Sequence, residues 1–395
     1  MYRAPSPITE THPYPFTIDE YKARLAATRA GMKEAGVDIL LVSSPENVLY
    51  LTGYYNVGNA MFQGLVVPAS GEPQFVLRKL FFEGIAGVSW ISSGISVPDT
   101  ESMLDGTRAA IEILNGSRAR IGYDGADMHL PVDIIDGLRV QMPEATFVRS
   151  SGIVERGRAV KSAQEIAYIR EACAISVAGM EAGIAQIAPG VLENAVAGAM
   201  YNEMMRLGST FVSNQPYIYA GIRNPARRAS FEGHRLKAGD SIWFEGSGAV
   251  HRYHGPIMRT FSVGSPKPDV QRIHDVMAGA LNALLDAVRP GVTAGEVDRA
   301  ARARVESAGL GHQWLHRAGY SVGVSFPPNW GEGYIMDLKP NDPRPLKAGM
   351  VFHTVPWVLI PELGAIGLSE TWAVTETGVE VLTDTPRELR IADLG

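Results

Sequence analysis

Two glutamates in strand-like segments are the residues best suited to acid–base chemistry. Glu245 follows the apolar run 241–244, in a segment that predicts a central strand. Glu370 stands ahead of a second strand-like run, and we expect it to face Glu245 from an adjacent strand. A buried carboxylate costs free energy unless it is paired or reacts. Two opposed carboxylates raise each other's proton affinity, which suits one of them to general acid–base catalysis near neutral pH.

Further polar and aromatic side chains are candidates for the same site, and each also has a purely structural interpretation. Tyr320 could donate a hydrogen bond to substrate or to a developing oxyanion, or it could be a satisfied core tyrosine. His254 and His353 could move protons, or they could be buried histidines with local partners. Aromatic residues near a core usually only pack. Three are nevertheless expected to contact substrate: Tyr253, Trp330 and Trp357.

The composition indicates an ordinary globular protein of 395 residues with 46% apolar and 20% charged residues. This length exceeds what one hydrophobic core usually serves, so two domains are expected. A net charge of -6 gives no electrostatic reason to bind nucleic acid or an anionic membrane. The single cysteine, Cys173, excludes an intrachain disulfide and argues against a thiolate zinc site. The sequence has neither a secretory signal nor a membrane-length apolar run, so we expect a cytoplasmic protein whose partner is a small-molecule substrate.

The first 157 residues alternate predicted helices and strands, which is typical of an α/β domain. The first helix begins after the N-cap Thr17 and ends at Gly36. The predicted elements are a helix over 18–35, a strand over 37–42, a helix from 44, a hairpin over 64–77 and a strand over 118–124.

A second domain is predicted to begin near residue 158 and to run to residue 395. Ser162 and Glu165 have the spacing of a capping box, which marks the start of a long helix. Strand-rich segments lie between and after the later helices, so this half is predicted to be α+β. The later helices are expected over 192–207, 268–288 and 294–308.

The segment 237–261 resembles the signature of the pita-bread (M24) family, which includes methionine aminopeptidase, aminopeptidase P, prolidase and creatinase. The matching residues are Gly239-Asp240, Gly248-Ala249, Tyr253 and Arg259-Thr260-Phe261. The run 44–54 is similar to an element of the creatinase/prolidase N-terminal domain. The resemblance implies an α/β creatinase-like domain over 1–157 and an α+β pita-bread catalytic domain over 158–395. It also implies a homodimer in which one subunit's N-terminal domain closes the other subunit's active site.

Peptidases of this family bind two metal ions through five side chains, and most of those donors are missing here. The matching positions hold Glu245, Pro256, Tyr320, Val355 and Glu370. A slip of one residue would put Ser369 in the last position. At most two of the five positions keep a carboxylate, whereas a divalent ion needs several oxygen or nitrogen donors around one point. We therefore predict no metal and no other cofactor.

Two longer blocks are similar to the metal-independent ectoine hydrolases of this family. They cover 244–260, with the run His-Arg-Tyr-His-Gly-Pro-Ile, and 319–332, which ends in Pro-Pro-Asn-Trp-Gly-Glu. One position departs from the pattern, because creatinase and ectoine hydrolases have a histidine where this chain has Arg228. A guanidinium cannot shuttle protons at neutral pH, but it binds carboxylates well. We expect Arg228 to bind a substrate carboxylate.

Together these features predict a metal-independent hydrolase that cleaves an amidine or amide C–N bond in a small zwitterionic compound, with ectoine or a relative as substrate. Glu245 and Glu370 would divide attack and proton delivery between them. The alternatives are an Xaa-Pro aminopeptidase or prolidase with a rearranged metal site, a pita-bread lyase, and a catalytically inactive binding protein. Metal analysis would identify the peptidase, and the retained carboxylates argue against the inactive protein.

Overall fold

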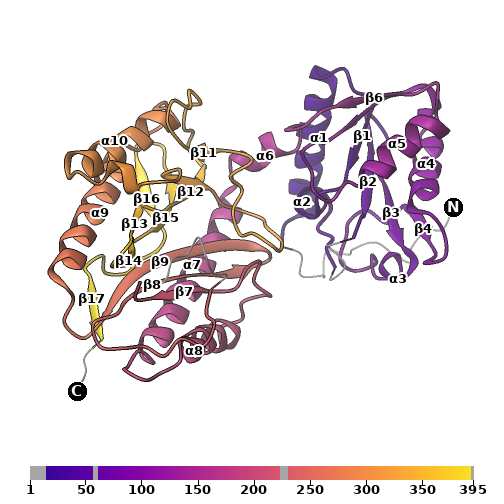
Figure 1. The fold of residues 1–395 in the computed structure, drawn as a ribbon. Helices are drawn as coiled ribbons and strands as arrows, with labels where there is room; N and C mark the ends of the chain where they lie inside the picture. The colour runs from indigo at the N-terminus through magenta and orange to yellow at the C-terminus, as the bar shows by residue number, and fades with distance from the viewer. Residues whose placement is uncertain (1–14, 57–60, 223–229, 393–395) are drawn as a thin grey trace. The chain divides into compact units, whose positions relative to one another are not determined.

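A computed structural model describes residues 15–56, 61–222 and 230–392 of the chain. The chain divides into two compact units, Met1–Arg158 and Ala159–Gly395 (Figure 1). No helix within the described ranges is long and apolar enough to cross a membrane.

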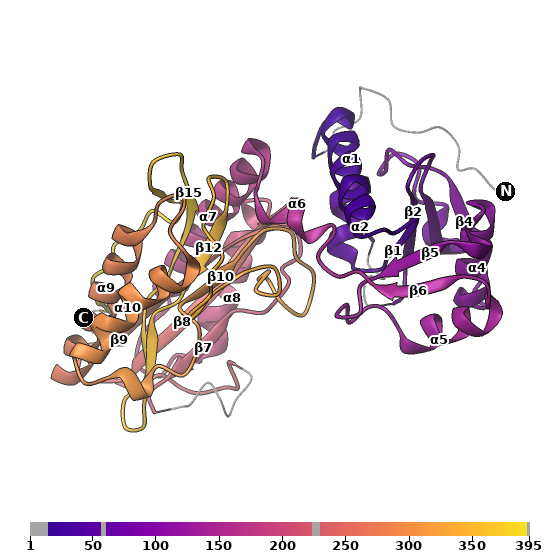
Figure 2. The ribbon, with the colours of Figure 1, turned by 90° about the horizontal axis from the view of Figure 1, so that it is seen from above.

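Unit 1 is a six-stranded mixed sheet with helices on both faces (Figures 1 and 2). The strands, in the spatial order β4-β3-β2-β1-β5-β6, are β1 (Ile39–Val42), β2 (Gly64–Pro68), β3 (Gln74–Arg78), β4 (Gly94–Val97), β5 (Arg120–Tyr123) and β6 (Thr146–Arg149). The helices are α1 (Ile18–Glu34), α2 (Pro45–Thr52), α3 (Lys79–Phe82), α4 (Met103–Ile113), α5 (Val132–Gln141) and α6 (Glu155–Ala159). One core lies between the sheet and α1 and α2, and a second lies between the sheet and α4 and α5.

The local signals of the sequence form as predicted in this unit. The Thr17 hydroxyl accepts the Glu20 N–H at the start of α1, and Gly36, at φ +62°, follows its end. The Ser44 side chain caps α2 in the same way. Strands β2 and β3 pair as the predicted antiparallel hairpin. The α/β fold expected for this half of the chain is therefore confirmed.

Unit 2 combines long helices with two larger sheets and a two-stranded hairpin, which confirms the expected α+β pita-bread fold. Its helices are α7 (Ala163–Ile184), α8 (Glu193–Arg206), α9 (Pro268–Ala287) and α10 (Ala294–Ser307). The first sheet, in the order β17-β9-β8-β7, contains β7 (Tyr217–Ala220), β8 (Ser241–Val250), β9 (Tyr253–Val263) and β17 (Arg390–Ala392). The second, in the order β11-β10-β12-β15-β16, contains β10 (Gly319–Ser321), β11 (Asp337–Leu338), β12 (Val351–Thr354), β15 (Glu370–Val374) and β16 (Val379–Val381). The hairpin is β13 (Trp357–Ile360) with β14 (Gly364–Gly367).

Helices α7 and α8 pack on one face of the first sheet, where side chains such as Ile242 and Phe244 are buried. Two glycines allow this close approach. Gly248 and Gly255 pair across β8 and β9, and a Cβ at Gly255 would lie 2.3 Å from the backbone nitrogen of Cys173 in α7. The expected capping box of Ser162 and Glu165 forms at the start of α7. The opposite face of the first sheet is not covered by α7 and α8.

The second sheet packs one face against α9 and α10 through a core that includes Phe352 and Trp372. Successive side chains of a strand point to opposite faces. His353 and Thr371, which pair across β12 and β15, therefore point away from the helices. This helix-free face of the second sheet contacts the helix-free face of the first, because Thr371 donates a 2.7 Å hydrogen bond to the Pro256 carbonyl in β9.

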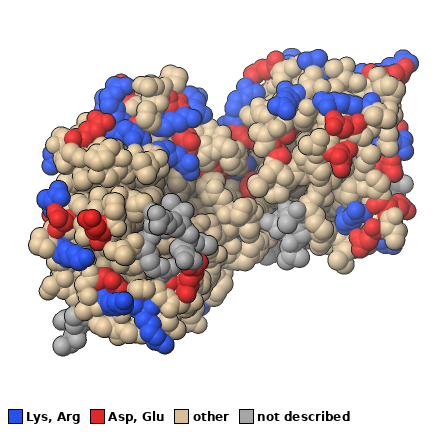
Figure 3. Space-filling model, in the orientation of Figure 1, with Lys and Arg blue, Asp and Glu red and all other residues tan. Residues whose placement is uncertain are grey.

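Charged side chains of both signs are interspersed on the face drawn in Figure 3. The described residues of that face form no extended area of one sign, in line with the small net charge of -6.

Candidate active site

Glu245 lies on the helix-free face of the first sheet, in the middle of β8. Antiparallel pairing places Tyr217 of β7 and Met258 of β9 directly across from it. Because side chains alternate along a strand, Trp243 shares this face whereas Phe244 points to α7 and α8. Only 6% of Glu245 is exposed. Its carboxyl group is thus held inside the unit, on the face that the second sheet covers.

The side chain that contacts Glu245 is His353 of β12. The His353 Nε2 atom lies 3.2 Å from Glu245 Oε1, and the imidazole is fully buried. The other ring nitrogen, Nδ1, lies 3.1 Å from the Thr371 hydroxyl oxygen. The imidazole therefore connects a hydroxyl group to a carboxyl group. Among the described residues Glu245 Oε2 has no hydrogen-bond partner, so one carboxyl oxygen is left for a substrate.

The hydrogen-bond chain fixes how many protons this pair holds. A carbonyl can only accept, so Thr371 uses its single proton on Pro256 and must accept from His353 Nδ1–H. The contact between Nε2 and Glu245 then needs a second proton, on either the imidazole or the carboxyl group. The pair is either carboxylate–imidazolium or carboxylic acid–imidazole. In both forms one proton is stored beside the reactive oxygen.

Tyr320 of β10 lies beside this pair. It is paired directly with His353 across the second sheet, and their ring centroids are 5.5 Å apart. Its hydroxyl oxygen accepts a 2.8 Å hydrogen bond from the Trp330 indole. Burial, and then the charge of Glu245, raise the pKa of Tyr320 well above its ordinary value. The phenol therefore keeps its proton and is suited to donate a hydrogen bond rather than to act as a base.

Glu370 does not face Glu245, contrary to expectation. One of its oxygens accepts from Arg259 at 2.9 Å and from Arg387 at 2.8 Å, and the other accepts from the Thr383 hydroxyl. Glu370 precedes Thr371 in β15, so its side chain points to the opposite face of the strand from Thr371 and His353. Its carboxylate is occupied by two guanidinium groups, and the expected pair of opposed carboxylates is replaced by a carboxyl–imidazole pair.

The cause of this difference is a register of one residue, which exchanges the two faces of a strand. Ser369, one residue earlier, lies on the side of Thr371. Its hydroxyl oxygen accepts from the Met258 N–H at 2.6 Å, and Met258 is the residue paired with Glu245. Ser369 rather than Glu370 thus lies on the side of the strand that faces Glu245.

The donor set does not fit the two-metal centre of those peptidases. Proline and valine, at positions 256 and 355, have no side-chain donor. Tyr320 keeps its proton, and Glu245 is bonded to His353. Within residues 15–56, 61–222 and 230–392, no three His, Cys, Asp or Glu side chains gather as a metal-binding group. The sheet tolerates a proline at position 256. The N–H and C=O groups of one strand residue point to the same side, and the Pro256 carbonyl points away from β8 to accept from Thr371. The N–H that proline lacks would therefore not have bonded to β8.

His254 lies further along the same face, across from Ala249. Its Nδ1 lies 2.9 Å from the Arg252 carbonyl, which requires a proton on Nδ1. The buried Nε2 has no hydrogen-bond partner among the residues that the structure describes. Burial, and then the charge of Arg252, lower the pKa of His254 well below its ordinary value. His254 is therefore a neutral imidazole with an unused lone pair, which is the form that can accept a proton or a hydrogen bond.

The remaining predicted contacts divide between the site and the rest of the molecule. Trp330 joins the site through Tyr320, and the Trp357 ring packs 5.9 Å from that of Trp243. Tyr253 lies outside the site. Its side chain points to the opposite face of β9 from His254, and its hydroxyl donates to Glu165 at the start of α7. Its match to the family signature reflects helix packing. Arg228 lies outside the described residues.

Sequence reasoning missed three contributors, Thr371, Tyr217 and Trp243. Thr371 follows the predicted Glu370 directly, so the correct register would have identified it. The alternation of two tyrosines in the run Tyr-Ile-Tyr-Ala of β7 is a signal for one aromatic face of a strand. Trp243 precedes Glu245 by two residues, a spacing that puts both on one face of a strand.

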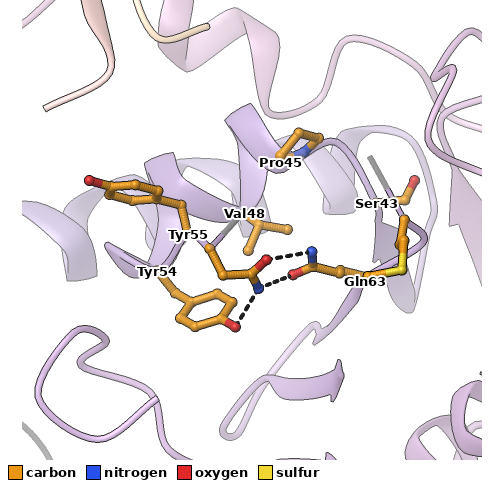
Figure 4. Close-up of a pocket in the computed structure, with 8 residues that line it drawn as sticks. Ser43, Pro45, Val48, Tyr54, Tyr55 and Gln63 are labelled. Carbon is orange, nitrogen blue, oxygen red and sulfur yellow. Dashed lines mark hydrogen bonds between the residues drawn. The ribbon is translucent and has the colours of Figure 1, made fainter. Parts of the chain in front are cut away.

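A separate small pocket lies in unit 1, at the end of α2 (Figure 4). Its amide side chains bond to each other: Gln63 donates to Asn56 at 3.1 Å, and Asn56 donates to Gln63 and to the Tyr54 hydroxyl. Burial raises the pKa of Tyr54 to about 12, an effect that the Asn56 hydrogen bond partly offsets. These amide and phenol groups are bonded to one another, and the described residues that line the pocket include no carboxyl–imidazole pair like that of Glu245 and His353.

Similarity to known proteins extends over nearly the whole chain. The sequence model of metallopeptidase family M24 matches residues 167–376, and that of the creatinase/prolidase N-terminal domain matches residues 24–160. The chain is 28% identical to an ectoine hydrolase of Halomonas elongata over 95% of this chain and 98% of that protein. It is 26% identical to an Xaa-Pro dipeptidase of Pyrococcus furiosus over 93% and 99%. The crystal structure of dipeptidase PepE from Mycobacterium ulcerans superposes with a TM-score of 0.83 at 26% identity, covering 95% of this chain and 99% of that one.

Proposed function

The chain belongs to metallopeptidase family M24, and within that family of hydrolases we propose that it cleaves a C–N bond of a small, zwitterionic, non-peptide compound without a divalent ion. Ectoine or a related cyclic amidine is the leading substrate. The observation that carries the proposal is the Glu245–His353 pair, which stores a proton beside an open carboxyl oxygen. Glu245 is one of the positions that the family resemblance matches to a metal ligand of the peptidases. The similarity to an ectoine hydrolase over nearly the full length of both chains supports the choice of substrate.

The free oxygen of Glu245 is the group that we assign to the reaction. In the carboxylate–imidazolium form, Oε2 takes a proton from water while the water oxygen forms a bond to the amidine carbon. The carboxyl group then returns that proton to the departing nitrogen as the C–N bond breaks. Alternatively, Oε2 attacks the carbon itself, and the proton stored on His353 passes to the departing nitrogen as the C–N bond breaks. Water then hydrolyses the covalent acyl intermediate on Glu245. One water molecule is consumed by either route.

Other residues of the site have supporting roles in this proposal. His353 holds the Glu245 carboxyl group and its shared proton in place, and is itself held by Thr371. The Tyr320 phenol donates a hydrogen bond to negative charge that develops on the substrate. His254, with its unused lone pair, accepts a hydrogen bond from a substrate N–H. Glu370 has a structural role because two arginines already occupy it. We also propose a homodimer, as the resemblance to the family implies.

A turnover screen of EDTA-treated protein tests the proposal directly. Ectoine, hydroxyectoine, creatine and Xaa-Pro dipeptides are supplied as substrates, and metal content is measured by elemental analysis. We expect cleavage of a non-peptide compound with no stoichiometric metal. Cleavage of Xaa-Pro dipeptides that EDTA abolishes and Mn²⁺ or Co²⁺ restores would instead support the peptidase function of the Pyrococcus furiosus relative.

The two routes at Glu245 are separated by a single-turnover reaction in H₂¹⁸O, followed by mass spectrometry of the peptide that contains Glu245. Label in the carboxyl group means that Glu245 attacks the carbon, because hydrolysis of the acyl intermediate returns a water oxygen to it. Label in the product alone, with no covalent adduct on the Glu245 peptide of the acid-quenched reaction, means that Glu245 acts as the base.

A further inference from the structure

We propose that aromatic side chains beside Glu245 form a box that binds the positively charged end of the substrate, a small molecule in which an alkylated or delocalised nitrogen cation lies close to a carboxylate. The inference rests on the proposed function, since it concerns the same site. Five side chains make up this aromatic box: Tyr217, Tyr219, Trp243, Trp330 and Trp357.

Trp243 stands at the centre of the aromatic box. Its ring centroid lies 5.5 Å from that of Tyr219, 6.4 Å from that of Tyr217 and 5.9 Å from that of Trp357. Trp330 lies 5.4 Å from Tyr217. These four pairs are inclined by 44° to 68°. Two other contacts are parallel stacks: Tyr217 lies at 12° to Tyr219, and His316 covers one face of Trp357 with ring centroids 4.6 Å apart. The faces left for a cation are therefore those that these stacks do not cover.

The electrostatics of the aromatic box favour a cation. The face of an aromatic ring carries negative charge and attracts alkylated ammonium and guanidinium-like groups, most strongly at tryptophan. Tyr217 is paired directly with Glu245, and in the carboxylate–imidazolium form the Glu245 carboxylate adds negative charge at the same place. Within the described ranges, no Lys or Arg lies over the rings of Tyr217, Trp243, Trp330 or Trp357. The neighbouring Tyr320 differs, because Arg317 lies 4.7 Å from its ring centroid.

The indole N–H of Trp243 is a second observation that points to a ligand. It is buried, since only 5% of the residue is exposed, and no described residue forms a hydrogen bond with it. Buried donors are nearly always paired. A ligand with an acceptor next to its cation would satisfy this N–H while the cation lies against the rings. Tyr217 and Trp357 are partly exposed, whereas Trp243 and Trp330 are buried, so the aromatic box has a rim and a base. A carboxylate–cation zwitterion fits both features.

Binding of three inert probes tests the aromatic box without turnover. Calorimetry on the full-length wild type measures tetramethylammonium, glycine betaine and 3,3-dimethylbutanoate, the last having the shape and carboxylate of betaine but no cation. We expect betaine to bind at least roughly tenfold more tightly than 3,3-dimethylbutanoate, a difference in the range of a desolvated cation–π contact.

Three variants locate the two ends of the ligand. Trp357→Leu should weaken tetramethylammonium and betaine by roughly threefold to thirtyfold, and Trp357→Phe, which keeps a ring, by less. Trp243→Phe removes the N–H but keeps a ring, so it should weaken betaine more than tetramethylammonium. Equal binding of betaine and 3,3-dimethylbutanoate to the wild type would overturn the aromatic box, and this comparison holds even if a variant fails to fold. If instead the probes bind as expected but no C–N compound is hydrolysed, the proposed function fails and the cation site stands.

Discussion

Glu245 and Glu370 are the same residue type, buried in the same unit, and the structure gives them different partners. Glu245 has one imidazole on one oxygen, and its other oxygen has no partner among the described residues. Glu370 has two guanidinium groups on one oxygen and a hydroxyl on the other. A carboxylate saturated by cations is a fixed negative charge, whereas a carboxyl group that shares a proton and keeps an open oxygen can react. Burial of a carboxyl group therefore does not by itself identify a catalytic acid. The hydrogen-bond partners of the carboxyl group distinguish a reactive glutamate from a structural one.

The largest expected effect is on catalysis, at Glu245. Glu245→Gln removes the ionisable oxygen but leaves an amide N–H that can donate to His353 Nε2, so the fold should be kept. We expect kcat to fall by roughly a hundredfold to ten-thousandfold. Steady-state kinetics on the substrate identified by the screen would measure this, with circular dichroism as the control for folding. Unchanged turnover would make Glu245 structural.

Glu370→Gln is the counterpart and should act on stability first. The change leaves Arg259, which is buried, without its charge partner. Removing one member of a buried ion pair typically destabilises a protein by about 3–5 kcal/mol. Urea unfolding would measure the loss of unfolding free energy. If Glu370→Gln keeps full stability but loses turnover, Glu370 is catalytic and the distinction between the two glutamates is wrong.

Acid pH should destabilise the region around Glu370 through His274 of α9. Burial lowers the pKa of His274 to about 4; the nearby charge of Arg259 acts in the same direction, whereas those of Asp275 and Glu388 oppose it. The unfolded chain binds a proton near pH 6.5 and the folded chain does not. Stability is therefore full above pH 6.5 and declines as the pH falls toward 4, by up to about 3 kcal/mol. Urea midpoints between pH 7 and pH 4 would measure the slope, and His274→Gln should flatten it.

The smallest effects come from a matched pair of threonines, one beside each carboxyl group. Thr371→Val removes the acceptor of His353 Nδ1–H, and should lower kcat by about tenfold and shift the pH profile of kcat. Thr383→Val removes the hydroxyl that donates to Glu370, and should lower unfolding free energy by about 1.5–3 kcal/mol while leaving the pH profile unchanged. Equal pH profiles in the two variants would mean that Thr371 has no influence on the proton shared by Glu245 and His353.

Local sequence signals predicted the fold well because they act over a few residues. Thr17, Ser44 and Ser162 cap the helices that were expected to follow them, and the apolar runs of unit 1 became its strands. The resemblance over 237–261 also placed Glu245 in a central strand of the catalytic unit. The same reasoning could not separate signature residues that pack from those that react: the Tyr253 hydroxyl donates to Glu165 at the start of α7 and does not reach the site.

The sequence by itself determined the element types, the pita-bread fold and the lack of metal donors at positions 256 and 355, since each depends on residue identity or short-range periodicity. Tertiary structure alone decided which side chains meet. Glu370 and Ser369 differ by one position, and only the pairing of β15 with β12 and its contact with β9 places Ser369 and Thr371 on the side of Glu245. His353 became the partner of Glu245 in the same way, because the two strands lie in different sheets more than one hundred residues apart. A period of two residues cannot fix the absolute register of a strand, so the face that a side chain occupies is known only once its neighbours are in place.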